Sequence, residues 1–335
     1  MSKNMDNREL NLMISVIKKY YELGMNQEQI AKEEFISKSS VCRLIKKAQD
    51  NGFVSYKINY PMESIRSLEN EFHKRFKLNK VFITPAYTED TQIRLQDTCR
   101  SVADDICKII RASDSIGISW GTTMEQVAAA LDALPNNKKC EKIIMMNGSV
   151  AGDVASLKSS QTVERFADFF SAEGYILPVP LLVDSKIVAN LIRIDSHVQN
   201  VMNMAIASQF AVLSIGGVSP QTVLMRRNAY TKAEYDEIMA MGAVGDIAGR
   251  YFDMNGCEVC ATIAERTLGI ELKELKKKKI RMGIAVGNHK VRAVIGALRG
   301  NIVNMLYMDE MTAQAVIEFL KNNERENQNE SSKDV

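Results

Sequence analysis

Hydrophobic positions follow two different periods, one before and one after residue 80. In the first part, apolar residues recur every three or four positions, as at Leu10, Ile14 and Ile17. This is the period of a helix with one buried face. From Lys80 onward, short apolar runs alternate with longer amphipathic stretches, which predicts strands alternating with helices. We therefore expect a helical module followed by an α/β module.

The α/β module is expected to form a doubly wound, mostly parallel sheet with helices on both faces. The strands are expected at 81–84, 115–119, 142–146, 211–215, 281–286 and 303–308. The helices are expected at 91–111, 125–134, 161–172, 190–205, 232–241, 291–298 and 312–322. Two prolines interrupt 176–183, so this segment is at most an edge strand.

The first 52 residues carry the signals of three short helices. Gly24 is a plausible C-terminal stop for the first helix, and Asn26 and Ser37 are good N-caps for the second and third. A tight connection between the second and third helices describes a helix-turn-helix. The turn position that often takes glycine holds Phe35, and a bulky residue is disfavoured there because the position needs a positive φ.

The third helix has a basic outer face. Segment 37–57 holds five basic residues and one acid, a local charge of +4, whereas the whole chain carries only +2. Small polar side chains at a helix start can approach base edges, and Arg and Lys reach phosphates or guanine. A solvated basic face is the alternative. The candidate DNA-binding residues are Gln27, Lys38, Ser39, Ser40, Arg43, Lys46 and Lys47.

The two modules are joined by a short connecting region. Segment 53–59 alternates and suggests a β-wing, and Pro61 opens a helix to about Phe76. Its apolar seam (Ile65, Leu68, Phe72 and Phe76) could pair with a second subunit or pack on the main domain. The expected domains are 1–60 for DNA binding, 61–78 as linker helix, 79–323 for effector binding and oligomerisation, and 324–335 as a polar, disordered tail.

Segment 117–124, GISWGTTM, joins a strand to a helix through a tight loop. Gly121 allows the turn, and Thr122 and Thr123 lie where helix amides lack partners. Amides and helix dipole favour an anion such as phosphate at that place. An ordinary Thr-capped helix is the alternative.

Polar residues also follow the other strands. Loops after parallel strands converge on one sheet edge, where ligands bind. Asn147, Gly216, Gly217 and Lys290 follow strands there, and Asp246 could accept bonds from sugar hydroxyls. Lys290 could pair with phosphate as a point charge. The set suits a small, polyhydroxylated, anionic ligand.

Composition sets limits on the class of protein. The chain has 335 residues with 46 % apolar and 25 % charged side chains, a globular composition, and no apolar run reaches the length of a membrane span. The start lacks the apolar core of a signal peptide, so a cytoplasmic location is expected. Six cysteines are too sparse for a disulfide framework, and the lone pair Cys257 and Cys260 lacks the second pair that a structural zinc needs. No metal or cofactor is expected.

Several motifs in one order carry a resemblance to the SorC-type sugar-binding transcriptional regulators, over most of the chain from Leu10 to about Glu318. The motifs lie at 27–31, 39–44, 117–123, 242–247, 250–253 and 290–300. The resemblance implies a helix-turn-helix, an effector domain like sugar-phosphate isomerases and glucosamine-phosphate deaminases, and an oligomer, a dimer or tetramer. Operator DNA and a phosphorylated sugar are the implied partners.

By position, the resemblance implies that Thr122, Thr123 and Lys290 hold the effector phosphate and that Asp246 holds sugar hydroxyls. Asn147 falls on a strand-end effector position, and Gln161 and Arg226 are further implied contacts. In one branch of the family the Asn147 position is a lysine that forms a Schiff base with the open-chain sugar. An amide nitrogen is not nucleophilic. A reversibly bound hexose, pentose or tetritol phosphate is therefore expected, not a covalently held deoxyribose phosphate.

The expected function is that of a DNA-binding regulator of carbohydrate metabolism. The alternative is a sugar-phosphate isomerase or deaminase-like enzyme, which needs a matched acid and base. The three histidines lie far apart in sequence and no carboxylate–histidine pair stands out. We therefore expect no catalytic residues. A purely structural or interaction module is less economical, because it leaves the basic third helix unexplained.

Overall fold

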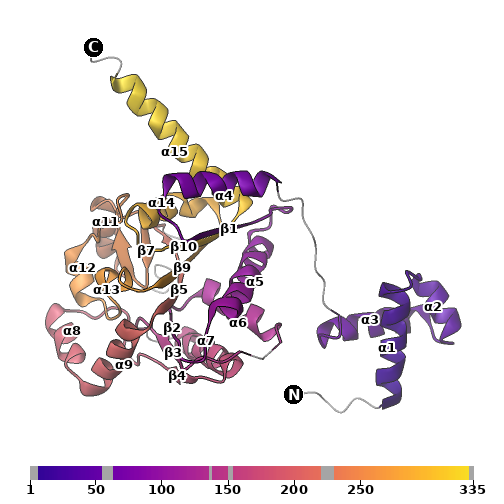
Figure 1. The fold of residues 1–335 in the computed structure, drawn as a ribbon. Helices are drawn as coiled ribbons and strands as arrows, with labels where there is room; N and C mark the ends of the chain where they lie inside the picture. Colours follow the sequence, from indigo (N-terminus) through magenta and orange to yellow (C-terminus); the bar gives the residue numbers. More distant parts are fainter. Residues whose placement is uncertain (1–6, 55–62, 136–137, 150–153, 220–229, 332–335) are drawn as a thin grey trace. The chain divides into compact units, whose positions relative to one another are not determined.

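A computed structural model describes residues 7–54, 63–135, 138–149, 154–219 and 230–331. The chain divides into two compact units, residues 1–60 and 61–335 (Figure 1). The expected β-wing at 53–59 falls largely outside the described residues.

The first unit is a three-helix bundle with the expected caps. Its helices are α1 (Asn7–Tyr21), α2 (Gln27–Glu33) and α3 (Lys38–Asp50). Asn26 accepts hydrogen bonds from the amides of Glu28 and Gln29, and Ser37 accepts one from the amide of Ser40. A small apolar core joins the three helices. The helix-turn-helix geometry follows from local signals that the sequence displays.

Phe35, in the turn between α2 and α3, has a φ of 53° and a side chain that is 93 % exposed. The turn therefore keeps its usual left-handed backbone conformation in spite of the bulky residue. Because that conformation brings Cβ close to the following carbonyl oxygen, it costs roughly 1–2 kcal/mol for an L-residue other than glycine. The exposed ring recovers little of this cost through burial.

Replacing Phe35 by glycine should therefore raise the free energy of unfolding of the first unit by about 1 kcal/mol. Phe35→Ala is the matched control, since alanine removes the ring and keeps the Cβ. Chemical denaturation followed by circular dichroism would measure both variants. Equal stabilisation by alanine and glycine would contradict backbone strain as the cause.

The second unit is built on a seven-stranded, parallel sheet in the order β1-β10-β9-β5-β2-β3-β4. The strands are β1 (Lys80–Thr84), β2 (Ser115–Ile118), β3 (Lys142–Met145), β4 (Glu173–Tyr175), β5 (Phe210–Ser214), β9 (Ile280–Ala285) and β10 (Met305–Asp309). The predicted fold class is confirmed. β4 is one of the two edge strands, and it ends before the two prolines that the sequence placed in an edge strand or extended segment.

Helices cover both faces of the sheet (Figure 1). One apolar core lies under α5 (Thr91–Ile109), α6 (Thr122–Asp132) and α7 (Val154–Phe170). The other lies under α4 (Glu63–Arg75), α14 (Val291–Arg299) and α15 (Glu310–Ser331). The other helices of the described residues are α8 (Lys186–Arg193), α9 (Ser196–Ala207), α11 (Lys232–Ala240), α12 (Ala261–Arg266), α13 (Leu272–Leu275) and the short 3-10 helix η1 (Asn288–Lys290).

The structure departs from the expected elements in several places. The helix expected at 190–205 is two helices, α8 and α9, because Asp195 caps a new helix by accepting from the amides of His197 and Val198. A three-stranded antiparallel sheet forms from β6 (Gly216–Gly217), β7 (Gly245–Ile247) and β8 (Arg250–Phe252). The helix expected at 161–172 begins earlier, at Val154. Two- and three-residue strands leave no periodicity in the sequence, so the small sheet could not be predicted.

The seam of α4 packs within its own unit. Ile65 and Phe72 are fully buried in the core that also holds α14 and α15. Of the two alternatives for this seam, the structure has the intramolecular one.

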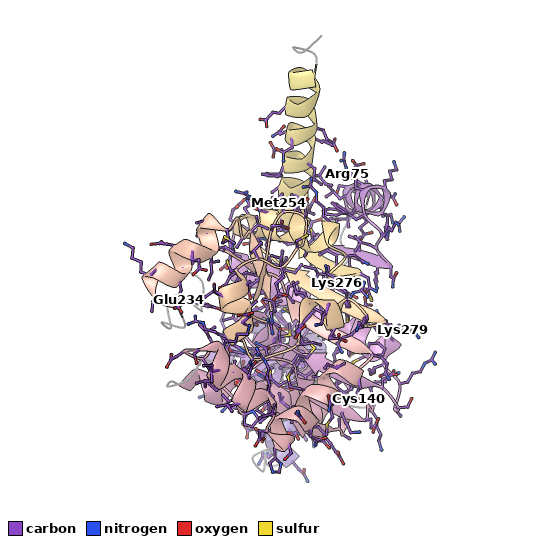
Figure 2. All side chains as sticks on the ribbon, turned by 90° about the vertical axis from the view of Figure 1, so that its left-hand side faces the viewer. Arg75, Cys140, Glu234, Met254, Lys276 and Lys279 are labelled. Atoms are coloured by element: carbon purple, nitrogen blue, oxygen red, sulfur yellow. The ribbon has the colours of Figure 1, made fainter. Side chains whose placement is uncertain are left out.

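The expectation of a disordered tail from residue 324 is wrong for the described residues, because α15 continues to Ser331. Glu324 forms an ion pair with Arg75 of α4, which lies beside the base of α15 (Figure 2). Glu, Arg, Asn and Gln are poor markers of burial, but Glu, Arg and Gln are good helix formers. A helix can therefore extend past its packed part without apolar anchors.

Candidate functional site

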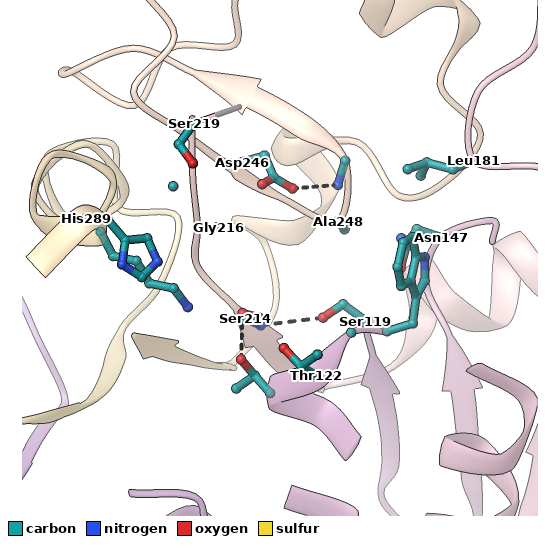
Figure 3. A pocket seen from close by; sticks show the side chains of 16 residues that line it. Ser119, Thr122, Asn147, Leu181, Ser214, Gly216, Ser219, Asp246, Ala248 and His289 are labelled. Atoms are coloured by element: carbon teal, nitrogen blue, oxygen red, sulfur yellow. Dashed lines mark hydrogen bonds between the residues drawn. The ribbon is translucent and has the colours of Figure 1, made fainter. Parts of the chain in front are cut away.

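A cavity of about 510 Å³ lies at the carboxyl end of the large sheet (Figure 3). The chain runs from β2 to β3 and β4 on one side, and β5 lies on the other side of β2. The cavity therefore occupies the switch point between β2 and β5, where ligands bind in open α/β sheets. Its lining residues are Ser119, Trp120, Gly121, Thr122, Thr123, Asn147, Leu181, Ser214, Gly216, Gly217, Ser219, Asp246, Ala248, Gly249, His289 and Lys290.

One wall of the cavity is the N-terminus of α6. Gly121 precedes the helix with a φ of 127°, a backbone conformation that residues with a side chain rarely adopt. As a glycine it has no side chain to cap the helix amides. Thr123 is buried and its hydroxyl accepts a hydrogen bond from Ser214 Oγ at 3.1 Å, whereas Thr122 is exposed. The wall thus offers uncapped amides and hydroxyls, which suit an anion.

Lys290, at the start of α14, supplies a cation to the same cavity. Its amine makes no hydrogen bond or salt bridge to another described residue. Burial lowers the pKa of Lys290, and the negative charges of Asp246 and Asp309 oppose that shift. Lys290 is partly buried, so an amine there without a partner is costly, and an anionic ligand would remove that cost.

Asp246 lies on β7, in the small antiparallel sheet. Its Oδ2 accepts a hydrogen bond from the amide of Gly249 at 3.2 Å. Gly216 pairs with Asp246 across the sheet and leaves space for the carboxyl, because a Cβ at this position would overlap Asp246 Oδ1. Burial raises the pKa of Asp246 to about 6, against the lowering effects of the Gly249 amide and of Lys290. The carboxyl is the strongest acceptor in this part of the cavity.

The raised pKa of Asp246 predicts a pH-dependent stability. The unfolded carboxyl has a pKa near 3.9, so between about pH 4 and 6 the folded state keeps a proton that the unfolded state releases. This contribution is fully present below pH 4 and is lost as the pH rises through 6. Asp246→Asn should therefore be more stable than the wild type above pH 6, by about 1 kcal/mol or more, with the difference shrinking toward pH 4.

Urea unfolding at pH 4.5, 6 and 7.5 (about one to two pH units apart, so that the proton is lost stepwise) would measure this difference. Asp236→Asn, at an exposed carboxylate of α11, is the control. Parallel stability curves for the wild type and Asp246→Asn would contradict the assignment.

Asn147 is 3 % exposed, and its Oδ1 has no hydrogen-bond partner among the described residues. Gly269 packs against it, since a Cβ on Gly269 would lie 2.8 Å from Asn147 Cβ. Trp120 Nε1 donates to the Gly148 carbonyl at 2.7 Å and ties the β2 loop to the β3 loop. A buried acceptor without a partner is rare, and a ligand hydroxyl could satisfy it.

Six of the eight residues that the sequence suggested for effector binding line this one cavity: Gly121, Thr122, Thr123, Asn147, Asp246 and Lys290. Gln161 lies on α7, exposed and outside the cavity lining, and Arg226 falls outside the described residues. Sequence reasoning did not single out Ser119, Trp120, Ser214 or His289 as ligand contacts. Ser119 and Ser214 could have been found from their positions at strand ends.

The candidate DNA-binding residues lie on and around α3. Ser39, Arg43, Lys46 and Lys38 are exposed, and Ser40, Lys47 and Gln27 are partly exposed. Two of the cations are held by ion pairs, Lys38 with Glu28 at 2.8 Å and Lys47 with Glu9. Among the described residues, Arg43 makes only a 3.4 Å hydrogen bond to Ser40 Oγ, so its guanidinium can reorient toward DNA at little cost.

Other chemistry is sparse in the part of the chain that the structure covers. No group of three or more potential ligands there could hold a metal ion, and no described helix is long and apolar enough to cross a membrane. All six thiols are free, with Cys257 exposed and Cys260 buried.

A helix-turn-helix unit followed by a parallel sheet with a polar cavity at its switch point defines a class, the ligand-controlled DNA-binding regulators. The chain belongs to the family described as "Putative sugar-binding domain", which matches residues 60–318. The predicted resemblance to sugar-binding transcriptional regulators is confirmed.

The comparisons with individual proteins agree with this family. The chain is 29 % identical to the deoxyribonucleoside regulator of Bacillus subtilis (strain 168), over 94 % of this chain and 100 % of that protein. It is 26 % identical to the sorbitol operon regulator of Klebsiella pneumoniae, over 92 % and 98 %. The crystal structure of the full-length sorbitol operon regulator SorC matches with a TM-score of 0.74 and 25 % identity, over 93 % of this chain and 99 % of that one. These relatives are transcriptional regulators.

Proposed function

We propose that this protein is a transcriptional regulator of carbohydrate metabolism whose operator binding is controlled by a phosphorylated sugar. The observation that carries the proposal is the convergence of an uncapped helix N-terminus, a partly buried amine and two acceptor groups on one cavity of about 510 Å³. Pockets of this size hold small ligands. The family membership and the regulators among the relatives support the same function.

In this proposal the two sides of the cavity have different roles. The amides at the start of α6, the hydroxyls of Thr122 and Thr123, and Lys290 bind the phosphate. Asp246 and Asn147 accept hydrogen bonds from sugar hydroxyls. Asn147 cannot form a Schiff base, so this position binds the ligand through hydrogen bonds and not covalently.

Residues 1–60 bind DNA in this proposal, 61–78 link the modules, and 79–323 bind the effector and oligomerise. Ligand binding changes the spacing of the DNA-binding units in a homo-oligomer, and half-sites lie about 34 Å apart on one face of DNA. A coupling free energy of about 1–3 kcal/mol would change operator affinity some 5- to 150-fold. Equal operator affinity and oligomeric state with and without a bound phosphosugar would contradict this mechanism.

DNA binding through α3 is tested by Arg43→Ala. We expect this variant to weaken binding about 10-fold, because it removes a cation from the exposed face of the recognition helix. Fluorescence anisotropy with the DNA upstream of the gene that encodes the chain would measure it, with Arg100→Ala on α5 as control. Phosphosugar binding should remain. An unchanged affinity of Arg43→Ala for a fragment that the wild type binds would count against this interface.

The enzymatic alternative has one observation in its favour. Asp246, with a pKa raised to about 6, and His289 line the same cavity, although the sequence separates them. A carboxyl that titrates near neutrality can act as an acid or base. Incubating the wild type with each phosphosugar that it binds, followed by analysis of products, tests this alternative. Turnover that Asp246→Asn abolishes would favour an enzyme.

A further inference from the structure

Helix α8 carries apolar side chains on two opposite faces. Ala189 is fully buried in an apolar cluster with residues of α9, and Ile192 packs against that cluster. On the opposite face, Ile187, Leu191 and Ile194 are 73 %, 60 % and 68 % exposed. In Figure 1, α8 lies at the outer margin of its unit. A helix that is apolar on both faces is normally covered on both.

The polar side of α8 is already satisfied within the unit. Lys186 forms an ion pair with Glu265 at 2.7 Å, and Arg193 donates to the carbonyls of Glu265 and Thr267, each at 2.9 Å. Arg193 also donates to Asn190. A partner that covers the outer face therefore need not supply counter-charges for these two cations.

We propose that the outer face of α8, formed by Ile187, Val188, Leu191 and Ile194, is a self-association surface that packs against the same face of a second copy. The row Ile187, Leu191, Ile194 has offsets of four and three, so it forms one apolar stripe along the helix. Two such stripes related by a two-fold axis are complementary, because each residue meets an apolar residue of the copy.

The size of this stripe fits a dimer. With the exposed fractions of its four residues, the face presents roughly 400 Å² of apolar surface, a size at which the largest apolar patch of a monomer is often functional. This is about half of the ~800 Å² that each partner buries in a standard interface, the apolar centre of which is surrounded by a polar rim. The face belongs to the second unit. The apolar seam of α4 in the same unit is buried, so that seam is not available to a partner.

A second surface competes for the same role. A groove of about 540 Å³ runs between α11, α14 and α15, and Met239 at its edge is 47 % exposed. Arg292 and Glu318 also line this groove. Charged side chains are depleted at the centres of interfaces, so the α8 face is the better candidate.

The double variant Ile187→Glu/Leu191→Glu tests the proposal. Around a two-fold axis it places four carboxylates (two per copy) together, and like charges at an interface are strongly unfavourable. We expect its mass by light scattering to be half that of the wild type, while Met239→Glu keeps the wild-type mass. Circular dichroism confirms that each variant is folded. An unchanged mass of the double variant, a monomeric wild type, or dissociation by Met239→Glu alone would overturn the proposal.

A cross-linking variant makes the test independent of dissociation. Leu191→Cys is prepared in a Cys42→Ser/Cys257→Ser background, because these two are the exposed native thiols of the described residues. Under mild oxidation we expect a covalent dimer for Leu191→Cys and none for Met239→Cys in the same background. No dimer from Leu191→Cys and from Ile187→Cys would overturn the proposal even if the glutamate variants misfold.

Discussion

Lys290→Met should lower the affinity for phosphorylated sugars about 100-fold while leaving the weak binding of the matching free sugars unchanged. A hydrogen bond to a charged group contributes roughly 1.5–3 kcal/mol, and the amine of Lys290 is a cation without a hydrogen-bond partner among the described residues that line the cavity. Isothermal titration calorimetry with phosphorylated and free forms of one sugar measures the difference. The phosphate-specific loss is the feature that identifies Lys290 as the phosphate cation.

Arg292→Met is a matched control for this experiment. Arg292 is an exposed cation on α14, two positions along the chain from Lys290, and it does not line the cavity. Its loss should change phosphosugar affinity by less than about twofold, because exposed charges are screened by solvent. Equal losses for free and phosphorylated sugars in Lys290→Met would mean that the substitution deforms the cavity instead. Operator binding without ligand should remain in both variants.

Gly256→Ala should destabilise the second unit by about 3 kcal/mol or more. Gly256 has a φ of 71°, and an added Cβ would overlap Gly300 Cα and lie 2.5 Å from the Gly296 carbonyl oxygen and 2.7 Å from the Gly300 amide nitrogen. These atoms belong to the backbone at the end of α14, so no side chain can move aside. Overpacking costs roughly 1–3 kcal/mol and the left-handed conformation adds about 1–2 kcal/mol.

Gly242→Ala separates the two causes. Gly242 has a φ of 79°, close to that of Gly256, but no atom lies within 4 Å of an added Cβ. The free energy of unfolding of Gly242→Ala should therefore fall only by the cost of the left-handed backbone conformation, about 1–2 kcal/mol. Urea unfolding of both variants measures the difference. A similar loss of stability in Gly256→Ala and Gly242→Ala would show that the close contact between the turn at Gly256 and α14 contributes little to the effect.

The sequence by itself determined the features that depend on nearby residues. Asn26 and Ser37 marked the starts of α2 and α3, because a cap accepts hydrogen bonds from amides two or three positions along the chain. Phe35 marked a turn that needs a positive φ, and the structure has a φ of 53° there. The strand ends at Gly121, Asn147 and Lys290 were also visible, since parallel strands bring such ends to one edge.

Only the tertiary structure decided how distant segments meet. The small sheet that brings Asp246 to the cavity depends on pairing between Gly216 and Asp246, 30 positions apart, and no local pattern encodes that pairing. The same holds for α4. Its apolar seam was compatible with a second subunit and with the main domain, and the structure places it in the core of its own unit. Gln161 lies within α7 and not at its start, outside the cavity lining, because α7 begins earlier than its periodicity indicated. Periodicity and caps are set by neighbours along the chain, whereas pairing and burial are set by residues that only the folded chain brings together.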